Sequence, residues 1–360
     1  MPTMTPEAGT ARGDGRRFSR TFLAWLCALS GAYLALAVWV DPRGDFGIRV
    51  FPTVSLDSRK EKMYLFDRSN RTRPVQGLVL GSSRAMKVAP EDLGRLTGKR
   101  WFNFSVDSAR AEDYLAIYRW ARRRDPGLDS VLLGLDVEAF HDGVGFDDRL
   151  KACPELMRAL EGGGAGSGGG APLGDALTRL KTVMSRFYAQ DVVRSLQIAV
   201  HRPPVLMSFD GAGYLHYVRW EGQRRDGSFD LQANLAGSRE EYLRRFKEMR
   251  GLSEERKLRL RTLLGEARRD GVRVVLWLTP LHPDLAAYLA RETRYPALLS
   301  AAREFAAASA KEAGAPFRDF SEPGGFGGTE TGWYDGGHVD ESNAALIVRA
   351  LARDREKNGL

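Results

Sequence analysis

The stretch VQGLVLGSSR, residues Val75–Arg84, decides the fold. Its first part, Val75–Leu80, is a short apolar run that ends in Gly81-Ser82-Ser83. A run of this length, closed by small turn-forming residues, is typical of a buried strand that enters a tight turn. The apolar residues do not alternate with polar ones, which favours a strand of a parallel sheet covered on both faces. The sequence therefore predicts a buried strand with Ser83 in the turn at its carboxyl end.

Four further segments are also predicted to be strands, and they alternate with helical patterns. The predicted strands are Trp101–Val106, Ser130–Val137, Val272–Leu278 and Phe317–Phe320. The predicted helices are Glu112–Arg123, Ser253–Arg269, Ala286–Ala313 with a break near Tyr295-Pro296, and a C-terminal helix that begins in Ala344–Ala352. Strands that alternate with helices indicate an α/β fold, with about five parallel strands between helices on both faces.

The alternation is interrupted between the third and fourth strands. Residues 141–250 contain the glycine-rich loop Gly162–Gly170, and we expect them to form a cap-like insertion over the strand ends. Tyr214, Tyr217 and Trp220 lie there, and they either stack on sugar rings or form the small core of the cap. The predicted organisation is a basic tail (1–21), an anchor (22–40), a linker or stalk (41–73), a core in two parts (74–140 and 251–360), and the insertion (141–250).

Composition narrows the function classes. The chain has 360 residues, of which 43% are hydrophobic and 28% charged, and this excludes a mainly disordered protein. The net charge of +8 is mild for this length; it suits an anionic surface but does not indicate a nucleic-acid partner. With only Cys27 and Cys153, the chain cannot build a disulfide framework or a cysteine-rich zinc site.

An uncharged run near the N-terminus indicates how the chain meets a membrane. Phe22–Val40 holds 19 residues, which nearly span the ~30 Å hydrocarbon layer of a bilayer. The arginines that precede it are expected to stay in the cytoplasm, so that everything after Asp41 lies outside it. We expect a retained single-pass anchor in the inner, or cytoplasmic, membrane, with a periplasmic main domain. A cleaved signal peptide is one alternative, because Ala35-Leu36-Ala37 is similar to a cleavage site, and a buried core helix is another.

Polar residues at the strand ends suggest a catalytic site. The carboxyl ends of parallel strands meet at one edge of a sheet, and ligands bind in the loops there. Ser83 follows the first strand, while Asp335 and His338 precede the last helix. A serine nucleophile needs a base within hydrogen-bond reach and a third group that orients the base. These three residues therefore form a candidate triad.

The order of these motifs resembles the SGNH/GDSL hydrolase superfamily. Its first block corresponds to Gly81-Ser82-Ser83, with Ser83 as nucleophile, and its last block to Asp335 and His338. Its second block corresponds to Asn103 with Ser108 in the place of an oxyanion glycine. Its third block, Gly-x-Asn, corresponds to Gly134-Leu135-Asp136. The resemblance implies a three-layer α/β/α fold, no cofactor and no metal.

The expected oxyanion hole consists of Ser83, Ser108 and Asp136. Ser82 and Ser108 replace the family's aspartate and glycine, and Ser108 still offers a backbone N–H group. Asp136 stands where the family has an asparagine that donates to the oxyanion, and an ionised carboxylate only accepts hydrogen bonds. Asp136 is therefore protonated, or turned away, or the hole relies on backbone N–H groups alone.

Three more residues are expected to contact substrate: Arg84, Asn103 and His282. For Arg84, a salt bridge to Asp107 or Asp136 is the alternative. The anchor and the motifs together are similar to membrane-anchored members of the superfamily that act on cell-surface polymers.

The resemblance implies an O-acyltransferase or esterase that acts on a cell-envelope polysaccharide. Its partners would be that polysaccharide or an acyl donor, together with a membrane acyl-transfer or export protein. The alternatives are an inactive SGNH-fold scaffold that binds glycan in an export complex, and a lipid or thioester hydrolase if the cap forms an apolar groove.

Overall fold

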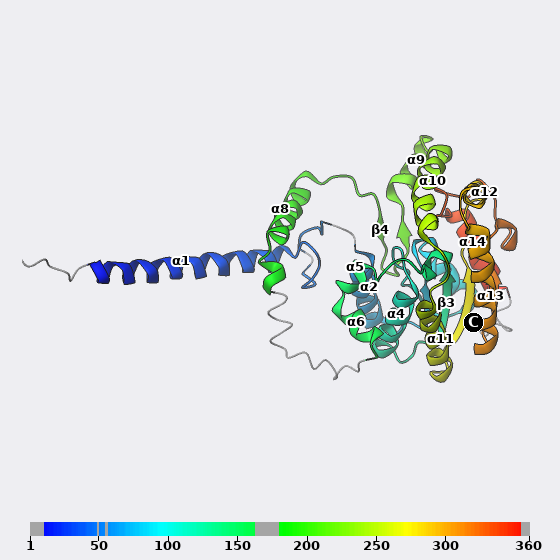
Figure 1. The fold of residues 1–360 in the computed structure, drawn as a ribbon, viewed down its shortest axis with the longest axis horizontal. Helices are drawn as coiled ribbons and strands as arrows, with labels where there is room; N and C mark the ends of the chain where they lie inside the picture. Colours follow the sequence, from blue (N-terminus) through cyan, green and yellow to red (C-terminus); the bar gives the residue numbers. More distant parts are fainter. Residues whose placement is uncertain (1–10, 49, 55–56, 163–179, 354–360) are drawn as a thin grey trace, which may run out of the picture. The chain divides into compact units, whose positions relative to one another are not determined.

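A computed structural model describes residues 11–48, 50–54, 57–162 and 180–353, and the chain divides into two compact units (Figure 1). The described part of the first unit is 11–48, 50–54 and 180–203, and that of the second unit is 57–162 and 204–353. Most of the predicted glycine-rich loop and residues 1–10 of the basic tail lie outside the described residues.

The second unit is built on a five-stranded parallel sheet in the order β2-β1-β3-β6-β7. The strands are β1 (Gly77–Leu80), β2 (Trp101–Asn103), β3 (Ser130–Leu135), β6 (Arg273–Leu278) and β7 (Phe317–Asp319). Each lies inside one of the five predicted strands, so the α/β class with five parallel strands is confirmed. The central strands β1 and β3 are buried along their whole length, which is why their sequences do not alternate.

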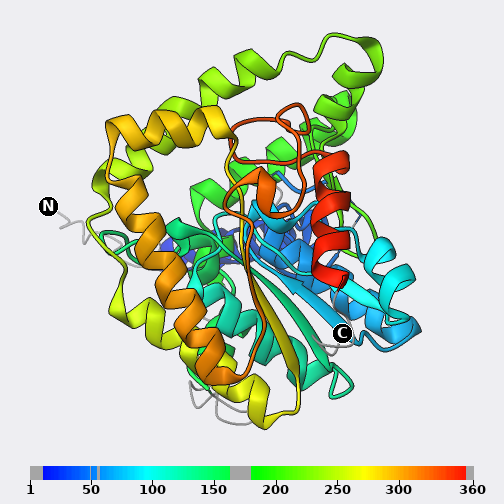
Figure 2. The ribbon, with the colours of Figure 1, turned by 90° about the vertical axis from the view of Figure 1, so that its right-hand side faces the viewer.

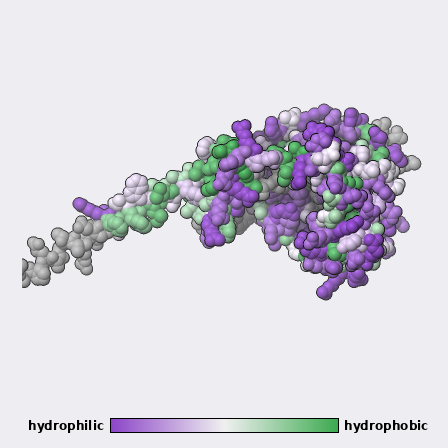
Figure 3. All heavy atoms as spheres, turned by 90° about the horizontal axis from the view of Figure 1, so that it is seen from above, coloured by the Kyte–Doolittle hydropathy of each residue, from purple (hydrophilic) through white to green (hydrophobic). Residues whose placement is uncertain are grey.

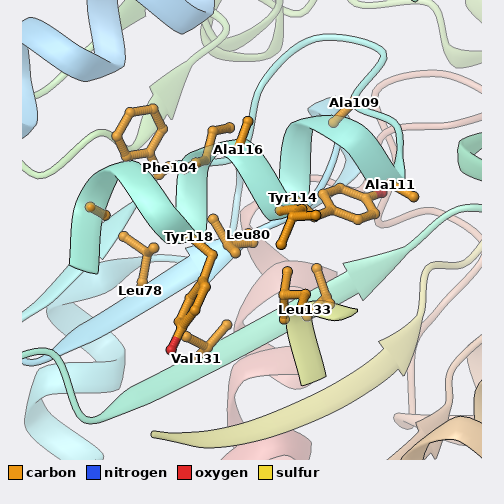
Figure 4. Close-up of a cluster of buried hydrophobic side chains, with 14 of the residues drawn as sticks. Leu78, Leu80, Phe104, Ala109, Ala111, Tyr114, Ala116, Tyr118, Val131 and Leu133 are labelled. Carbon is orange, nitrogen blue, oxygen red and sulfur yellow. The ribbon is translucent and has the colours of Figure 1, made fainter. Parts of the chain in front are cut away.

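Helices cover both faces of this sheet (Figure 2). On one face, alternate strand residues such as Leu78, Leu80, Val131 and Leu133 pack against a layer of helices. That layer comprises α4 (Ala111–Arg124), α11 (Glu254–Arg269) and α13 (Tyr295–Ala313). Figure 4 shows Tyr114 and Tyr118 of α4 above the strands.

On the opposite face, the intervening residues Val79, Leu132, Val275 and Trp277 pack against α3 (Pro90–Thr97) and α14 (Glu341–Ala352). Figure 2 shows α13 and α14 on opposite sides of the strands. Adjacent residues of one strand thus enter two separate cores, as the period of two in a strand requires.

Local signals set the helix boundaries. The Ser253 side chain accepts a hydrogen bond from the N–H of Arg256 at the start of α11. The predicted break in Ala286–Ala313 is present, because α12 (Pro283–Glu292) ends before Tyr295, where α13 begins with a proline in its first turn. The C-terminal helix α14 begins at Glu341, with Asp340 as its N-cap.

The expected linker 41–73 differs from the structure in its second half. Residues Ser58–Thr72 form α2, which belongs to the second unit and buries Leu65 and Phe66 in its core. A linker was predicted here because the segment is rich in charged residues. Its buried charges, however, find partners far along the chain: Arg59 donates to Asp113, and Lys62 donates to backbone carbonyls.

The expected insertion 141–250 does not form one body. Its first helices, α5 (Asp148–Lys151) and α6 (Pro154–Leu160), belong to the second unit, where α6 packs beside α4. Residues 180–203, which include α8 (Arg186–His201), belong to the first unit. The rest returns to the second unit as the antiparallel strands β4 (Ser208–Phe209) and β5 (Leu215–His216), α9 (Val218–Asp226) and α10 (Leu231–Glu248).

The first unit contains α1 (Ala11–Val40) as well as α8. Within α1, residues 17–40 form a helix long and apolar enough to cross a membrane. Short 3-10 turns complete the fold: η1 (Ser83–Ala85), η2 (Val137–Phe140) and η3 (Pro323–Gly325).

Candidate functional site

The predicted site residues come from loops at the carboxyl ends of the strands. Ser83 begins η1 after β1, Ser108 lies after β2, and Asp136 immediately follows β3. Asp335 and His338 lie on the loop between β7 and α14. Because the strands are parallel, all these loops lie at the same edge of the sheet.

The turn that carries Ser83 is tightly packed. A Cβ atom on Gly81 would lie 2.6 Å from the Cβ of Ala85, so a side chain does not fit there. The Ser82 hydroxyl accepts a hydrogen bond from the N–H of Arg84 at 3.1 Å and caps η1. Ser82 therefore stabilises the turn that presents Ser83.

Ser83, His338 and Asp335 form a continuous hydrogen-bonded chain. The Ser83 Oγ lies 2.9 Å from His338 Nε2, although 255 positions separate them in the sequence. His338 Nδ1 lies 2.9 Å from each carboxylate oxygen of Asp335. This network assigns the proton to Nδ1, so that Nε2 is free to accept the Ser83 proton. The three residues have the relative positions that general-base activation of a serine requires.

The Asp335 carboxylate is fixed and charged. Its Oδ1 accepts hydrogen bonds from the backbone N–H groups of Gly337 and His338, both at 2.8 Å. Burial raises the pKa of Asp335, but the charge and hydrogen bonds of His338 outweigh burial and hold it below its ordinary value. Burial likewise lowers the pKa of His338, but Asp335 outweighs it and holds that pKa above its ordinary value. The pair therefore stabilises an imidazolium at His338.

The loop around His338 has no room for side chains on its glycines. A Cβ on Gly337 would lie 2.0 Å from the hydroxyl of Tyr242 in α10, and one on Gly336 would lie 2.6 Å from Leu285 of α12. The Tyr217 ring also packs edge-on to the His338 ring, at 5.8 Å between centroids. Elements on both sides of the loop thus hold His338 in place.

Two backbone N–H groups near Ser83 are available as donors. Ser108 adopts a left-handed conformation with φ of 50°, which explains why a glycine suits this position. Within the described residues, the N–H groups of Ser83 and Ser108 donate to no other group. They are therefore candidates for binding an oxyanion.

Asp136 is turned towards Arg84 and Thr279. Its Oδ1 accepts a hydrogen bond from the Thr279 hydroxyl and lies 3.8 Å from Nη1 of Arg84. Its Oδ2 has no hydrogen-bond partner among the described residues. Of the three alternatives for Asp136, this geometry favours a carboxylate that is engaged elsewhere, with backbone N–H groups left to form the hole.

The three residues expected to contact substrate each have partners within the protein. Arg84 is buried, with an ion pair to Glu138 as well as Asp136. The Asn103 amide donates to the carbonyls of Ala85 and Val88, both at 2.9 Å, and its oxygen accepts from the N–H of Ser105. Its hydrogen-bonding capacity is therefore used to fix the segment after Ser83.

His282 has a similar structural position. Its Nδ1 accepts from the N–H of Asp284 and caps α12, while Nε2 lies 3.0 Å from the carbonyl of Glu330. Its backbone N–H donates to the carbonyl of Gly336 in the His338 loop. These contacts make His282 a positioning residue for the loop, because both ring nitrogens are occupied.

Sequence reasoning missed Lys87. Its ammonium lies 4.5 Å from the ring centre of Tyr214, and it pairs with Glu221 and Glu341. Lys87 thereby ties η1 to α9 and α14. A lysine inside the apolar segment Ala85–Val88 was the available signal, since a buried lysine requires partners.

The aromatic residues of the hairpin region form a core. Tyr217 is 5% exposed and packs with Trp220 and Tyr334. Of the two alternatives for Tyr217 and Trp220, this favours the small core over a sugar-stacking surface. Tyr214 packs edge-on to His216 and beside Lys87.

A cavity of about 310 Å³ opens beside Ser108 and Asp136. Most of its other lining residues are polar and carry charges of both signs, among them Arg110, Arg244 and Glu248. Arg244 has no hydrogen-bond or ion-pair partner among the described residues. The cavity can therefore take a polar ligand close to the candidate oxyanion donors.

Comparison with known proteins yields no match, either to a protein-family model or to a curated protein.

Proposed function

We propose that the chain is a membrane-anchored O-acyltransferase or esterase of the SGNH type, which acts on a cell-envelope polysaccharide outside the cytoplasm. The observation that carries this proposal is the geometry of three residues. Ser83 Oγ lies 2.9 Å from His338 Nε2, and Asp335 lies 2.9 Å from His338 Nδ1. The order of the sequence blocks around these residues supports the family assignment.

The chemistry follows from these positions. Ser83 Oγ attacks an acyl carbonyl while His338 Nε2 takes its proton, and Asp335 stabilises the resulting imidazolium. The N–H groups of Ser83 and Ser108 donate to the oxyanion. When the bond to the leaving alcohol breaks, His338 protonates that alcohol and the acyl group stays on Ser83. A sugar hydroxyl or water then gives its proton to His338 and takes the acyl group, and Ser83 recovers its proton.

The surroundings of the site favour a carbohydrate over a lipid. The cavity beside Ser108 and Asp136 is lined by charged and polar side chains, which suit a hydrated polymer better than an acyl chain. The apolar helix Arg17–Val40 supports an anchored protein. A sheet domain that follows such an anchor meets envelope polymers on the outer side of the membrane.

A non-catalytic glycan-binding scaffold is the second candidate, and Asp136 favours it. The family position that carries an asparagine donor holds a carboxylate bound to Arg84 and Thr279. One side-chain donor is therefore missing from the hole. The intact chain of Ser83, His338 and Asp335 favours the enzyme.

A fluorophosphonate probe separates the two candidates. It phosphonylates a serine only where a base activates the hydroxyl, so the wild-type protein is expected to be labelled and Ser83→Ala is expected not to be. Ser300→Ala is the matched control, because Ser300 lies on the exposed surface of α13 and, among the described residues, its hydroxyl bonds only to Glu304. A folded wild-type protein that resists labelling would overturn the enzyme proposal and favour the scaffold.

A further inference from the structure

Apolar side chains are exposed in the first unit, in the segment that packs against the end of α1. Leu180, Met184 and Phe187 have 43%, 46% and 60% of their surface accessible. Leu180 lies in the helical stretch 180–183, Met184 in the turn that follows it, and Phe187 in the first turn of α8; we call these three residues the stripe. Leucine, methionine and phenylalanine side chains exposed together mark a contact surface.

This segment is packed against the end of α1. Val183, Tyr188 and Val192 form a buried cluster with Ala37 and Val40. Figure 1 shows α8 running across the end of α1 and not along it, and Figure 3 shows that the apolar surface of α1 continues where α1 ends.

Polar contacts fix the same arrangement. The Tyr33 hydroxyl donates to the carbonyl of Val183 at 2.7 Å, and Arg43 forms an ion pair with Asp191 at 2.6 Å. The segment and α1 are therefore one rigid support, and the depth of α1 in a bilayer sets the depth of the segment.

The contacts with Tyr33, Ala37 and Val40 place the stripe beside the outer end of the apolar span. Tyr33 lies seven residues before Val40, which is about 10 Å along a helix. The 24 residues of the apolar span are about 36 Å long, roughly 6 Å more than the hydrocarbon layer. Even if this whole excess lay beyond the outer boundary, Tyr33 would still be about 4 Å inside it. Val183 accepts a hydrogen bond from the Tyr33 hydroxyl and packs with Ala37 and Val40, so Val183 and its exposed neighbours lie between the level of Tyr33 and the outer end of α1.

We propose that residues 180–187 form a second membrane contact, in which Leu180, Met184 and Phe187 insert into the outer leaflet beside α1. The proposal rests on α1 spanning the membrane, as in the proposed function. Lys181 and Arg186 flank the stripe and are exposed, and their long side chains reach the lipid phosphates from this depth. Apolar side chains at an interface are buried about 5–10 Å into the headgroup and acyl boundary, which matches a stripe beside the outer end of α1.

The position of the stripe beside α1 favours lipid over a protein partner as the group that covers it. The stripe shares its level with the exposed surface of α1, which includes Leu36 and Trp39, and in a bilayer that surface meets acyl chains. A membrane protein that covers the stripe is the alternative outcome of the test below.

Depth-dependent quenching in vesicles tests the proposal. The full chain with Cys27→Ala keeps Cys153, which is buried, and receives one new cysteine for an environment-sensitive fluorophore. Phe187→Cys reports on the stripe, Leu26→Cys on α1, and Gln197→Cys on an exposed polar site farther along α8. The vesicles contain phosphatidylethanolamine and phosphatidylglycerol with nitroxide-labelled lipids.

The label at position 187 is expected to be quenched most by a nitroxide near the carboxyl end of the acyl chain, and to emit at shorter wavelength than the label at position 197. Quenching at 26 without quenching at 187 would overturn this proposal and leave the anchor intact; it would favour a protein partner on the stripe. Absence of quenching at both 26 and 187 would overturn the span itself. Fluorophosphonate labelling of the same samples reports separately on the enzyme.

Discussion

Replacing Asp136 with asparagine should increase esterase activity. Both known contacts of the Asp136 side chain, with Thr279 and Arg84, use Oδ1, whereas Oδ2 has no partner among the described residues. In Asp136→Asn the amide oxygen can keep the Thr279 hydrogen bond, and the amide nitrogen then takes the place of Oδ2. Because Asp136 and Ser108 line one cavity, this nitrogen is available as a further donor to the oxyanion.

The expected magnitudes follow from the contacts. A side-chain donor in an oxyanion hole is typically worth ~3 kcal/mol, or ~100-fold in rate, which is the upper limit of the gain. The cost is the ionic part of the contact with Arg84. The Coulomb attraction at 3.8 Å is about 4 kcal/mol at an effective dielectric constant of about 20, and it is largely offset by the desolvation of a buried carboxylate. Arg84 keeps Glu138 as its partner, so the free energy of unfolding should fall by only about 1 kcal/mol.

The assay is hydrolysis of p-nitrophenyl acetate, with kcat/KM measured alongside urea unfolding. Asp136→Ala is the matched control, since it removes the acceptor without adding a donor and should lose stability without gaining activity. Adding Ser83→Ala to Asp136→Asn should abolish the gain. A well-folded Asp136→Asn protein with an unchanged or lower rate would refute the missing-donor argument and leave a hole made of backbone N–H groups alone.

Two further predictions concern protonation. Labelling of Ser83 should rise with pH through a pKa above the ordinary value of histidine, because only neutral His338 accepts the serine proton and Asp335 raises its pKa. Asp335→Asn removes that charge, so the rise in labelling should move to lower pH and the labelling rate should fall by roughly 10⁴-fold. A rise that stays at the same pH would contradict the role of Asp335. Burial lowers the pKa of Lys62 to about 7. The folded chain therefore releases a proton that the unfolded chain holds up to about pH 10.5. Between these two pH values Lys62 makes the free energy of unfolding rise with pH. In urea unfolding at pH 7 and 9, Lys62→Met should flatten this rise. It should also lower the free energy of unfolding by about 2 kcal/mol, because the carbonyls of Asn103 and Gly213 lose their donor. An equal pH slope in both proteins would count against a lowered pKa of Lys62.

The order of the candidate triad residues along the chain could be predicted from the sequence. Ser83, Asp335 and His338 were predicted from turn signals at strand ends, and the structure places Ser83 and Asp335 each 2.9 Å from a ring nitrogen of His338. The prediction was possible because a parallel sheet collects its carboxyl-end loops at one edge whatever the details of packing.

The roles of the neighbouring residues could not be predicted in the same way. Asn103 and His282 carry groups that suit substrate binding, yet both use these groups on nearby backbone. Arg84 finds its carboxylate partners on the loop after β3, more than fifty residues away. A sequence shows which groups can form hydrogen bonds, but only the folded chain shows which of them are already paired.

The sequence by itself determined the α/β class, the five strands, the break between α12 and α13, and the apolar helix near the N-terminus, because apolar runs, caps and prolines act over a few neighbouring residues. Only the tertiary structure decided that the charged segment Ser58–Thr72 is a packed helix and that residues 180–203 join α1 and not the sheet domain. Both outcomes depend on contacts between distant parts of the chain, such as Arg59 with Asp113 and Tyr33 with Val183. A buried charge or an apolar face is stable only next to its partner, and the partner is chosen by the fold.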